Sequence, residues 1–547
     1  MTGRLTANRS RDNVILLSHQ KTTLGAGLKA FRLATITALP HRAPHMPTPT
    51  RLAAIDIGSN SFRLEIGRID HGQIQRVEYL KETVRLGNGL DDSRNLTPEA
   101  MQRGWGALAR FGERLAGFER SEVRAVATQT LREARNRDEF LLRARTLLGF
   151  GIDVIPGREE ARLIYQGVAH LLPQGERSDR ERRLVIDIGG RSTEMIIGRA
   201  LEAQTTESYR VGSVAWSMKY FAEGQFTPSA IRNAEVAAKA VIDDALGKYS
   251  REHWDQAYGA SGTIGAVGDV LAAAGYAPGL VTREGLDWLV ERLLAARSAD
   301  KLRIDGMREE RKAVIGGGLS VLRAVFDLLG IEQMKVAQGA LRHGLLYELL
   351  ERDEAVADLR SATVARLATR FGADAAQAER VGTVARALFI QLEPAAANPS
   401  GRAGRTLRKL GWAAQLHEIG TQISHSECHK HGAYILDNAD APGFATNELH
   451  WLSQLVLGHR GKLRKLGTAL DDEGFARALL ALRLAVILCH ARRKADPSAL
   501  RLSHNGRLVR IACTTAWSES YPQSTHLLRE EVLAWQKTSW QVEFCIE

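Results

Sequence analysis

The stretch IDIGSNSFRLEIGR at residues 55–68 recurs as IDIGGRSTEMIIGR at residues 186–199, displaced by 131 positions. Each copy is an apolar run that ends at an acid, passes through glycine and serine, and leaves on a second apolar run. Short apolar runs bounded by glycine-rich turns are typical of buried strands. The repeat therefore predicts two related α/β lobes, each of which presents one strand–turn–strand hairpin.

The rest of the sequence predicts the remaining strands and helices of the two lobes and the domains that follow them. Strands alternate with helical stretches as far as residue 350, a pattern that favours an α/β sheet in each lobe. A helix is expected over 97–115, with Thr97 as N-cap and Pro98 in the first turn. Beyond Glu351, Ala, Arg and Leu recur at helical spacing. We expect a leader over 1–50, lobes over 51–177 and 178–350, a helical domain over 351–500 and an α+β tail over 501–547.

Composition narrows the class of protein. The chain has 547 residues, a net charge of +11 and four cysteines that form no CxxC pair, which predicts a reduced, cytoplasmic protein. No apolar run approaches the roughly 20 residues that span a bilayer. Residues 1–50 hold seven Lys/Arg and one acid. We expect them to be a disordered extension or the product of a start codon upstream of Met46, and a transit peptide is the alternative.

Both predicted turns carry groups that suit phosphate oxygens. A tight turn after a buried strand directs backbone N–H groups and hydroxyls at an anion without a large side chain in the way. The candidates for phosphate binding are Gly58, Ser59, Asn60 and Ser61 in the first turn, Gly189, Gly190, Ser192 and Thr193 in the second, and Ser261, Gly262 and Thr263 after a later strand.

The acids at the ends of the first strands predict a metal site. Asp56 and Asp187 would repel a nearby phosphate unless a cation bridges them, and Mg²⁺ favours one or two carboxylates together with water and substrate oxygens. Asp187 and Glu194 lie on opposite arms of the second hairpin, where they would converge on one ion. The first copy has Arg63 at the position of Glu194. The first hairpin therefore favours anions and the second favours a metal.

A third group of residues suits the hydrolysis of a phosphoanhydride. That reaction needs a group that orients and deprotonates water, while the remaining catalysis is positioning and charge neutralisation. Glu159 and Glu160 open a predicted helix between the two hairpins, and the pattern alone leaves them tied. Arg132 follows a strand at the edge where open α/β sheets bind ligands. Arg311 lies close to a triple glycine and is a second basic candidate.

At these residues the chain resembles the exopolyphosphatase/guanosine pentaphosphate phosphohydrolase (Ppx/GppA) family, within the actin, Hsp70 and sugar-kinase superfamily. The matching motifs are DIGSNSF at 56–62, TLR at 130–132, GREEAR at 157–162, DIGGRSTE at 187–194, GASGT at 259–263, ERK at 310–312 and GALR at 339–342. The resemblance implies two ribonuclease H-like lobes, a helical HD-like domain and a small tail. The chain departs from the family at one position, because Arg191 stands where a small residue is usual. An arginine there would either add a phosphate contact or crowd the loop.

The resemblance also implies roles for particular residues. Glu160, the second acid of its motif, is implied to be the catalytic base, and Arg132 and Arg311 are implied to support it. Mg²⁺ is implied near Asp187 and Glu194, and both turns are implied to contact phosphate. A homodimer with possible association at the face of the inner membrane is implied as well, and we expect no specific nucleic-acid partner.

A histidine-rich segment invites a second metal site. The residues concerned are His417, His425, His429, His431 and His459. An intact HD site needs His-Asp where this chain has His417-Glu418. We therefore expect a structural module, in preference to a second hydrolytic centre.

Two phosphoanhydride substrates fit these motifs. We expect an exopolyphosphatase that releases orthophosphate from inorganic polyphosphate, with guanosine pentaphosphate (pppGpp) as the alternative substrate. Phe, Tyr and Trp make up 6% of the chain and no base-stacking platform stands out, which favours polyphosphate. A kinase of the same superfamily and a non-catalytic polyanion-binding protein are further alternatives.

Overall fold

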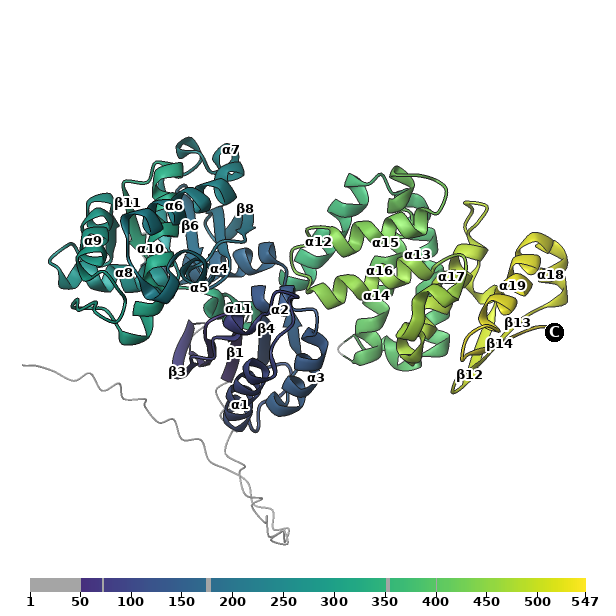
Figure 1. Ribbon diagram of the computed structural model, residues 1–547. Helices are drawn as coiled ribbons and strands as arrows, with labels where there is room; N and C mark the ends of the chain where they lie inside the picture. Colours follow the sequence, from purple (N-terminus) through teal and green to yellow (C-terminus); the bar gives the residue numbers. More distant parts are fainter. Residues whose placement is uncertain (1–50, 71–72, 174–178, 351–354, 400) are drawn as a thin grey trace, which may run out of the picture. The chain divides into compact units, whose positions relative to one another are not determined.

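The computed structural model describes residues 51–70, 73–173, 179–350, 355–399 and 401–547 (Figure 1). The predicted leader lies outside the described residues. The first sheet has the order β3-β2-β1-β4-β5. Its strands are β1 (Arg51–Ile57), β2 (Phe62–Asp70), β3 (Gln73–Glu82), β4 (Val123–Ala127) and β5 (Ile152–Val154).

The second sheet repeats this arrangement and has the order β10-β11-β9-β6-β7-β8. Its strands are β6 (Arg182–Ile188), β7 (Thr193–Arg199), β8 (Glu202–Tyr209), β9 (Gln256–Gly259), β10 (Leu280–Thr282) and β11 (Gln333–Val336). In both sheets the first strand is antiparallel to the second and parallel to the fourth, so β1 pairs with β2 and β4 as β6 pairs with β7 and β9. The prediction of two related α/β lobes is confirmed.

Eleven described helices accompany the two sheets. They are α1 (Pro98–Arg114), α2 (Gln129–Glu133), α3 (Arg137–Leu148), α4 (Gly157–Leu171), α5 (Ser213–Tyr220), α6 (Pro228–Ile242), α7 (Leu246–Tyr249), α8 (Gly262–Ala273), α9 (Arg283–Ala296), α10 (Glu309–Leu329) and α11 (Leu341–Leu350). Helix α1 begins as the sequence predicts, because the Thr97 hydroxyl accepts a hydrogen bond from the backbone N–H of Ala100.

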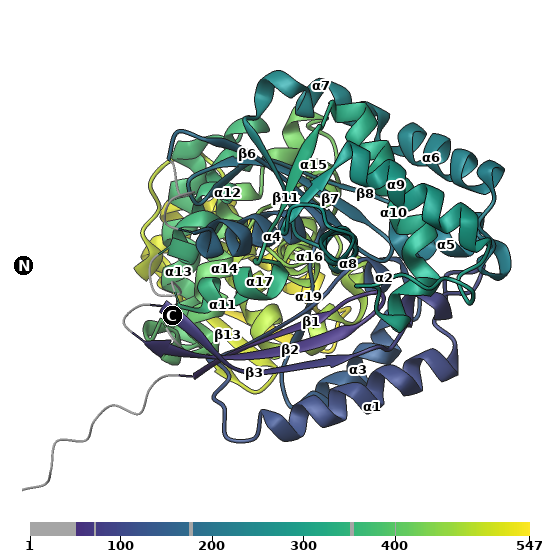
Figure 2. The ribbon, with the colours of Figure 1, turned by 90° about the vertical axis from the view of Figure 1, so that its left-hand side faces the viewer.

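The alternation of side chains along the strands gives each sheet two buried faces. In β1, Ala53, Ile55 and Ile57 join a core with residues of α1 and α3, and Figure 2 shows these two helices on the outer face of β1–β3. Leu52 and Ala54 point the other way, into a core shared with α4 and α11. That same core receives Val185, Ile196 and Tyr258 from the second sheet. Helices α4 and α11 therefore form a layer between the two sheets.

Three glycines allow α4 and α11 to touch through their backbones. A Cβ atom at Gly344 would lie 1.9 Å from the carbonyl oxygen of Leu163, and one at Gly167 would lie 2.2 Å from that of Ala340. A Cβ at Gly339 would lie 2.0 Å from the carbonyl oxygen of Gly167. No side chain fits at these positions without a shift of the backbone.

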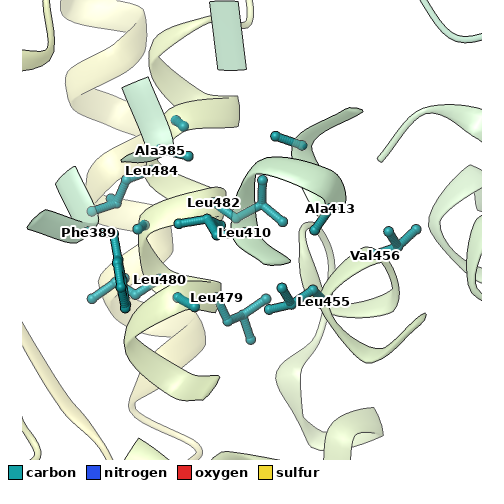
Figure 3. Packing of buried hydrophobic residues seen from close by; sticks show 14 of the residues in the cluster. Ala385, Phe389, Leu410, Ala413, Leu455, Val456, Leu479, Leu480, Leu482 and Leu484 are labelled. Carbon is teal, nitrogen blue, oxygen red and sulfur yellow. The ribbon is translucent and has the colours of Figure 1, made fainter. Parts of the chain in front are cut away.

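The remainder of the described chain is mainly helical, as predicted. The helices are α12 (Ala355–Arg370), α13 (Ala375–Leu392), α14 (Arg402–Leu416), α15 (Cys428–Asn438), α16 (Thr446–Gly458), α17 (Glu473–Leu488), α18 (Thr515–Ser520) and α19 (Pro522–Trp535). Figure 3 shows the core they build, where Phe389 of α13, Leu410 of α14, Leu455 of α16 and Leu479 of α17 pack together.

A third sheet closes the chain. It has the order β12-β13-β14, with strands β12 (Arg501–Asn505), β13 (Leu508–Cys513) and β14 (Gln541–Ile546). The buried side chains Val509, Ile511 and Trp535 belong to the same hydrophobic core as the helices before them. The predicted tail therefore shares its core with the predicted helical domain. In the described part of the chain, no helix is both long enough and apolar enough to cross a bilayer.

Candidate active site

The two acids of the repeated hairpins point into the layer between the sheets. Asp56 alternates with Ile55 and Ile57 and so shares a face of β1 with Ala54, while Asp187 shares a face of β6 with Val185. Those faces are the ones that α4 covers. The strand period of two therefore aims both carboxylates at the helix that carries Glu159 and Glu160.

Each acid heads a row of three side chains across its sheet. In the first sheet Asp56 lies opposite Arg63, and Arg63 lies opposite Lys81. In the second sheet Asp187 lies opposite Glu194, and Glu194 lies opposite Ser208. Directly opposed side chains in antiparallel strands are near neighbours. We call these the basic row (Asp56, Arg63, Lys81) and the acidic row (Asp187, Glu194, Ser208).

The contacts within each row match the charges of its side chains. The Arg63 guanidinium lies 3.0 Å from the Asp56 carboxylate, and the Ser208 hydroxyl donates a hydrogen bond of 2.8 Å to Glu194. No cation lies opposite Asp187 in its row. The divergence between the two copies that the sequence indicates thus corresponds to two walls of opposite charge.

Glu159 and Glu160, which the sequence does not distinguish, point in different directions from α4. Glu160 lines the cleft and accepts a hydrogen bond of 2.7 Å from Arg132. Glu159 points elsewhere, because it accepts two hydrogen bonds, of 2.8 and 2.7 Å, from Arg162 and one of 2.9 Å from the backbone N–H of Gly443. Glu160 is therefore the acid of this pair that is available to a substrate in the cleft.

The carboxylates that meet between the lobes disfavour one another's charge. Burial, reinforced by the nearby charge of Glu160, raises the pKa of Asp187 to about 7. Burial and the charges of Glu160 and Asp187 raise the pKa of Glu194 well above its usual range. Burial also raises the pKa of Glu160, although the Arg132 guanidinium acts in the opposite direction. Negative charge is therefore in excess locally, at Asp187 and Glu194, because their row contains no cation.

That imbalance fits a divalent cation. Asp187 and Glu194 are buried hard-oxygen ligands on adjacent strands, and a cation between them would relieve the repulsion that raises their pKa values. Within the described residues, no three His, Cys, Asp or Glu side chains form a ready-made set of metal ligands. Two carboxylates completed by water and phosphate oxygens are the arrangement that Mg²⁺ favours.

The cleft between the rows has a volume of about 350 Å³ and is lined by most of the predicted site residues. Those that line it are Asp56, Gly58, Ser59, Asn60, Ser61, Glu160, Asp187, Gly189, Gly190, Ser192, Ser261, Gly262, Thr263 and Arg311. The first two turns and the N-terminus of α8 thus face one space. This is the arrangement that a chain of phosphates requires.

Three of the predicted residues lie outside this lining. Arg132 is placed behind Glu160, and its other contacts are to Gln129 and the carbonyl oxygen of Ile155. Glu194 lies beneath the surface of the cleft, where it is 1% exposed. Thr193 is fully buried and its hydroxyl donates a hydrogen bond of 2.6 Å to the carbonyl oxygen of Val211, so it is not directed at a phosphate.

Arg311 is a half-buried cation beside the start of α8. Among the described residues its guanidinium makes neither a hydrogen bond nor an ion pair, and it lies over Gly262, where a Cβ atom would approach it to 2.3 Å. Burial and the charge of Arg63 lower the pKa of Arg311. Two guanidinium groups that line one cleft and feel each other's charge favour an anion beside them.

Sequence reasoning missed several residues of the cleft. They are Tyr79, Lys81, Asp269, Arg308, Gln338 and Arg342. Arg342 belongs to one of the quoted motifs, and its guanidinium is fixed by Glu65 at 3.1 Å. Contacts with His343 and Arg342 lower the pKa of Glu65 to about 2 despite its burial. Tyr79 and Lys81 show only a period of two along β3, which does not distinguish the cleft from the solvent side.

The histidine-rich segment forms a separate cluster in the helical region. The ring centres of His417 and His459 lie 5.4 Å apart, and those of His429 and His459 lie 6.3 Å apart. The Nδ1 atoms of His417 and His459 lie 2.7 and 2.6 Å from the carbonyl oxygens of Ala414 and Val456. Burial lowers the pKa of all three rings, to about 4 for His429. These are the properties of neutral, packed side chains.

Two family models match this chain, one over the two lobes and the other over the helical region. Residues 65–353 match the Ppx/GppA phosphatase family, and residues 359–533 match Ppx/GppA phosphatase, domain III. The chain is 38% identical over 479 residues to a guanosine-5′-triphosphate,3′-diphosphate pyrophosphatase of Vibrio atlanticus, covering 87% of this chain and 94% of the relative. It is 37% identical over 504 residues to the protein of the same name from Photobacterium profundum, covering 90% and 98%.

The solved structures agree with these matches. The crystal structure of an exopolyphosphatase-like protein is 25% identical and superposes with a TM-score of 0.50, covering 55% of this chain and 99% of that chain. An exopolyphosphatase from Cytophaga hutchinsonii, 24% identical with a TM-score of 0.50, covers 55% and 98% and shares the fold. The chain is a hydrolase of phosphoanhydride bonds. From its lobes, its helical domain and these relatives together, it belongs to the Ppx/GppA phosphatase family.

Proposed function

We propose that this protein hydrolyses the terminal 5′ phosphoanhydride of guanosine pentaphosphate and releases orthophosphate and the tetraphosphate. The observation that supports this substrate most strongly is the match, over nearly the full length of both chains, to relatives named guanosine-5′-triphosphate,3′-diphosphate pyrophosphatase. The sequence alone favours polyphosphate, and these relatives reverse that order.

The chemistry assigned to the cleft follows from its charges. The turns at 58–61 and 189–192 and the N-terminus of α8 offer donors to phosphate oxygens, and Arg63 and Arg311 offset the negative charge of the substrate. Glu160 accepts a proton from the attacking water, whose oxygen bonds to the terminal phosphorus as the bridging P–O bond breaks. Arg132 orients the Glu160 carboxylate.

A divalent metal is part of the proposal. Asp187 and Glu194 would hold Mg²⁺, which, when bound, neutralises charge that develops on phosphate oxygens. Without that cation, the acidic row would repel the substrate it faces.

Tyr79 is the feature of the cleft that favours a nucleotide. It is the one aromatic side chain among the described residues that line the cleft, and it is 39% exposed. The Arg342 guanidinium lies 5.0 Å from the centre of its ring, and the exposed Arg76 lies 5.9 Å from it. Tyr79 lies two residues along β3 from Lys81, about 7 Å beyond the basic row. A half-exposed ring at that place is suited to stack against a base.

Inorganic polyphosphate remains the second candidate substrate. Lys81, Arg308, Arg311 and Arg342 all line the cleft, and a row of cations suits any linear phosphate chain. The homodimer, the cytoplasmic location and the association with a membrane surface that the sequence predicts stay predictions.

Side-by-side kinetics test the proposal. The purified full-length chain is assayed with Mg²⁺ on guanosine pentaphosphate and on long-chain polyphosphate, and orthophosphate is measured. We expect a kcat/KM at least ~10-fold higher for the nucleotide. A higher kcat/KM for polyphosphate would reverse the assignment. Transfer of the phosphate to an acceptor other than water would identify a kinase, and binding without turnover would identify a polyanion-binding protein.

A further inference from the structure

Arg191 is the residue of the second turn that departs from the family pattern, and its side chain turns away from the cleft. Its Nε and Nη2 atoms donate hydrogen bonds of 3.2 and 3.0 Å to one carboxylate oxygen of Glu133, and its Nη1 donates one of 3.2 Å to the carbonyl oxygen of Gly87. Glu133 ends α2 and Gly87 lies in a short 3₁₀ helix over Leu86–Gly89. All these contacts lie in the first lobe, whereas Arg191 belongs to the second.

From Glu133 the contacts continue along α2. The second carboxylate oxygen of Glu133 accepts a hydrogen bond of 2.6 Å from the side-chain amide of Gln129. The amide oxygen of Gln129 accepts two, of 3.0 and 2.6 Å, from Arg132. Only one orientation of this amide satisfies both neighbours, because a carboxylate needs a donor and a guanidinium needs an acceptor.

The chain of contacts ends at the proposed base. Arg132 donates through Nη1 to Glu160 at 2.7 Å and to the carbonyl oxygen of Ile155 at 2.9 Å. Five side chains are therefore joined in one line, Arg191–Glu133–Gln129–Arg132–Glu160, with every hydrogen bond between 2.6 and 3.2 Å. The side chains of its ion pairs are between 10% and 22% exposed, so solvent competes weakly for these groups.

Near Arg191, helix α2 contacts both phosphate turns. A Cβ atom at Gly87 would approach the Arg191 side chain at 3.0 Å, the Thr130 hydroxyl at 3.2 Å and the Ser59 side chain at 3.3 Å. The Thr130 hydroxyl also donates a hydrogen bond of 2.8 Å to the Ser59 hydroxyl. Helix α2 thus meets the first turn through Thr130 and the second turn through Glu133.

We propose that Arg191 is a positioning residue for hydrolysis, which acts through Glu133, Gln129 and Arg132 to fix the orientation of the Glu160 carboxylate. Without Arg191, Glu133 loses its cation and competes with Glu160 for the adjacent guanidinium of Arg132. The effect would appear in turnover and not in binding, because the hydrogen bonds of the Arg191 side chain go to Glu133 and Gly87, neither of which lines the cleft. The proposal concerns attack by water and holds for either substrate.

Four full-length variants test it: R191A, E133Q, the double variant R191A/E133Q, and R199A. Arg199 ends the same hairpin at an exposed position, so R199A is the matched control. Steady-state kcat and KM are measured on whichever of the nucleotide and polyphosphate the wild type hydrolyses faster, and melting temperatures are recorded beside them. This choice of substrate separates the test from the assignment of guanosine pentaphosphate.

We expect R191A and E133Q each to lower kcat about 10-fold, with KM within about twofold of the wild type. The double variant should be no slower than the slower single variant, because both changes break one line of contacts. R199A should match the wild type. A raised KM at unchanged kcat in R191A would make Arg191 a phosphate ligand and overturn the proposal. An unchanged kcat in R191A would also overturn it. So would losses of kcat in the two single variants that add up in the double variant. If R191A yields no folded protein, E133Q decides, and wild-type kcat in E133Q overturns the proposal.

Discussion

Arg132 donates a 2.7 Å hydrogen bond to Glu160, and the two side chains are only 15% and 10% exposed. Burial raises the pKa of Glu160 and Arg132 lowers it, so R132A should raise that pKa further. Because a general base acts only when deprotonated, the acid limb of the pH profile of kcat/KM should move to higher pH. We expect a larger loss at pH 6.5 than at pH 9. A loss of equal size at every pH would contradict this role.

The neighbouring acids Glu159 and Glu160 form a matched pair of variants. E160Q should lower kcat at least ~10²-fold while substrate still binds. It should not lower the melting temperature, because burial disfavours the Glu160 carboxylate in the folded protein. E159Q should do the reverse. It weakens a buried pairing with Arg162, which lowers stability by about 1–3 kcal/mol, and leaves kcat within a few-fold. Equal losses of kcat in both variants would remove Glu160 from its role.

Stability without metal should depend on pH through Asp187. Its pKa is about 7 in the folded protein and near 4 in the unfolded chain, so the folded state binds this proton more tightly. Folding stability is therefore lost as pH rises from about 4 through 7. In the presence of EDTA, we expect the melting temperature to fall between pH 6 and pH 8. D187N should flatten this fall, and Mg²⁺ should reverse it in the wild type. An absence of any Mg²⁺ effect at pH 8 would argue against a metal at this site.

Tyr79 should separate nucleotide from linear phosphate. If a base stacks on its ring, Y79A should lower kcat/KM for guanosine pentaphosphate about 5- to 100-fold and leave tripolyphosphate unaffected, while Y79F retains wild-type values. Tyr434, 66% exposed in the helical region, supplies the control variant Y434A. Equal losses on both substrates would mean that Tyr79 supports the phosphate site instead of a base.

The close contact of α4 and α11 should make G344A destabilising. The added Cβ would lie 1.9 Å from the Leu163 carbonyl oxygen, so α4 and α11 could accommodate it only if their backbones moved apart. We expect a loss of about 1–3 kcal/mol in unfolding free energy. G247A is the control, because a Cβ at Gly247 meets nothing within 4 Å. The comparison requires only thermal melts, and an unchanged melting temperature for G344A would show that the helices separate readily.

Sequence reasoning succeeded where a residue's neighbours are fixed by local geometry. The constant spacing of the repeat was enough to predict two lobes, and the strand period then placed Asp56 and Asp187 on comparable faces. It failed to separate Glu159 from Glu160, because adjacent helical residues differ in direction only once the helix is placed against its neighbours. Thr193 was misjudged for a related reason, since its hydroxyl is taken by Val211, 18 residues away.

The roles of other residues could not be predicted because their partners lie far away in the sequence. Arg191 looks like an obstacle in a phosphate turn until Glu133, 58 residues earlier, is brought beside it. Tyr79 is one aromatic residue on β3, whose pairing with β2 shifts register opposite Ile66 and Gly67, so the alternation that would mark its face is interrupted. Overall aromatic content says nothing about where one ring is placed.

The unequal rows of the two sheets give the cleft a direction. A pocket built from two identical walls would be symmetric, and a linear phosphate chain would fit it equally well in either sense. Here one wall presents Arg63 and Lys81, and the other presents Asp187 with Glu194 buried beside it. A substrate that reaches from one lobe to the other therefore meets different surroundings at its two ends. One difference between the two copies of the hairpin, arginine in the first and glutamate in the second, thus accounts for much of this polarity.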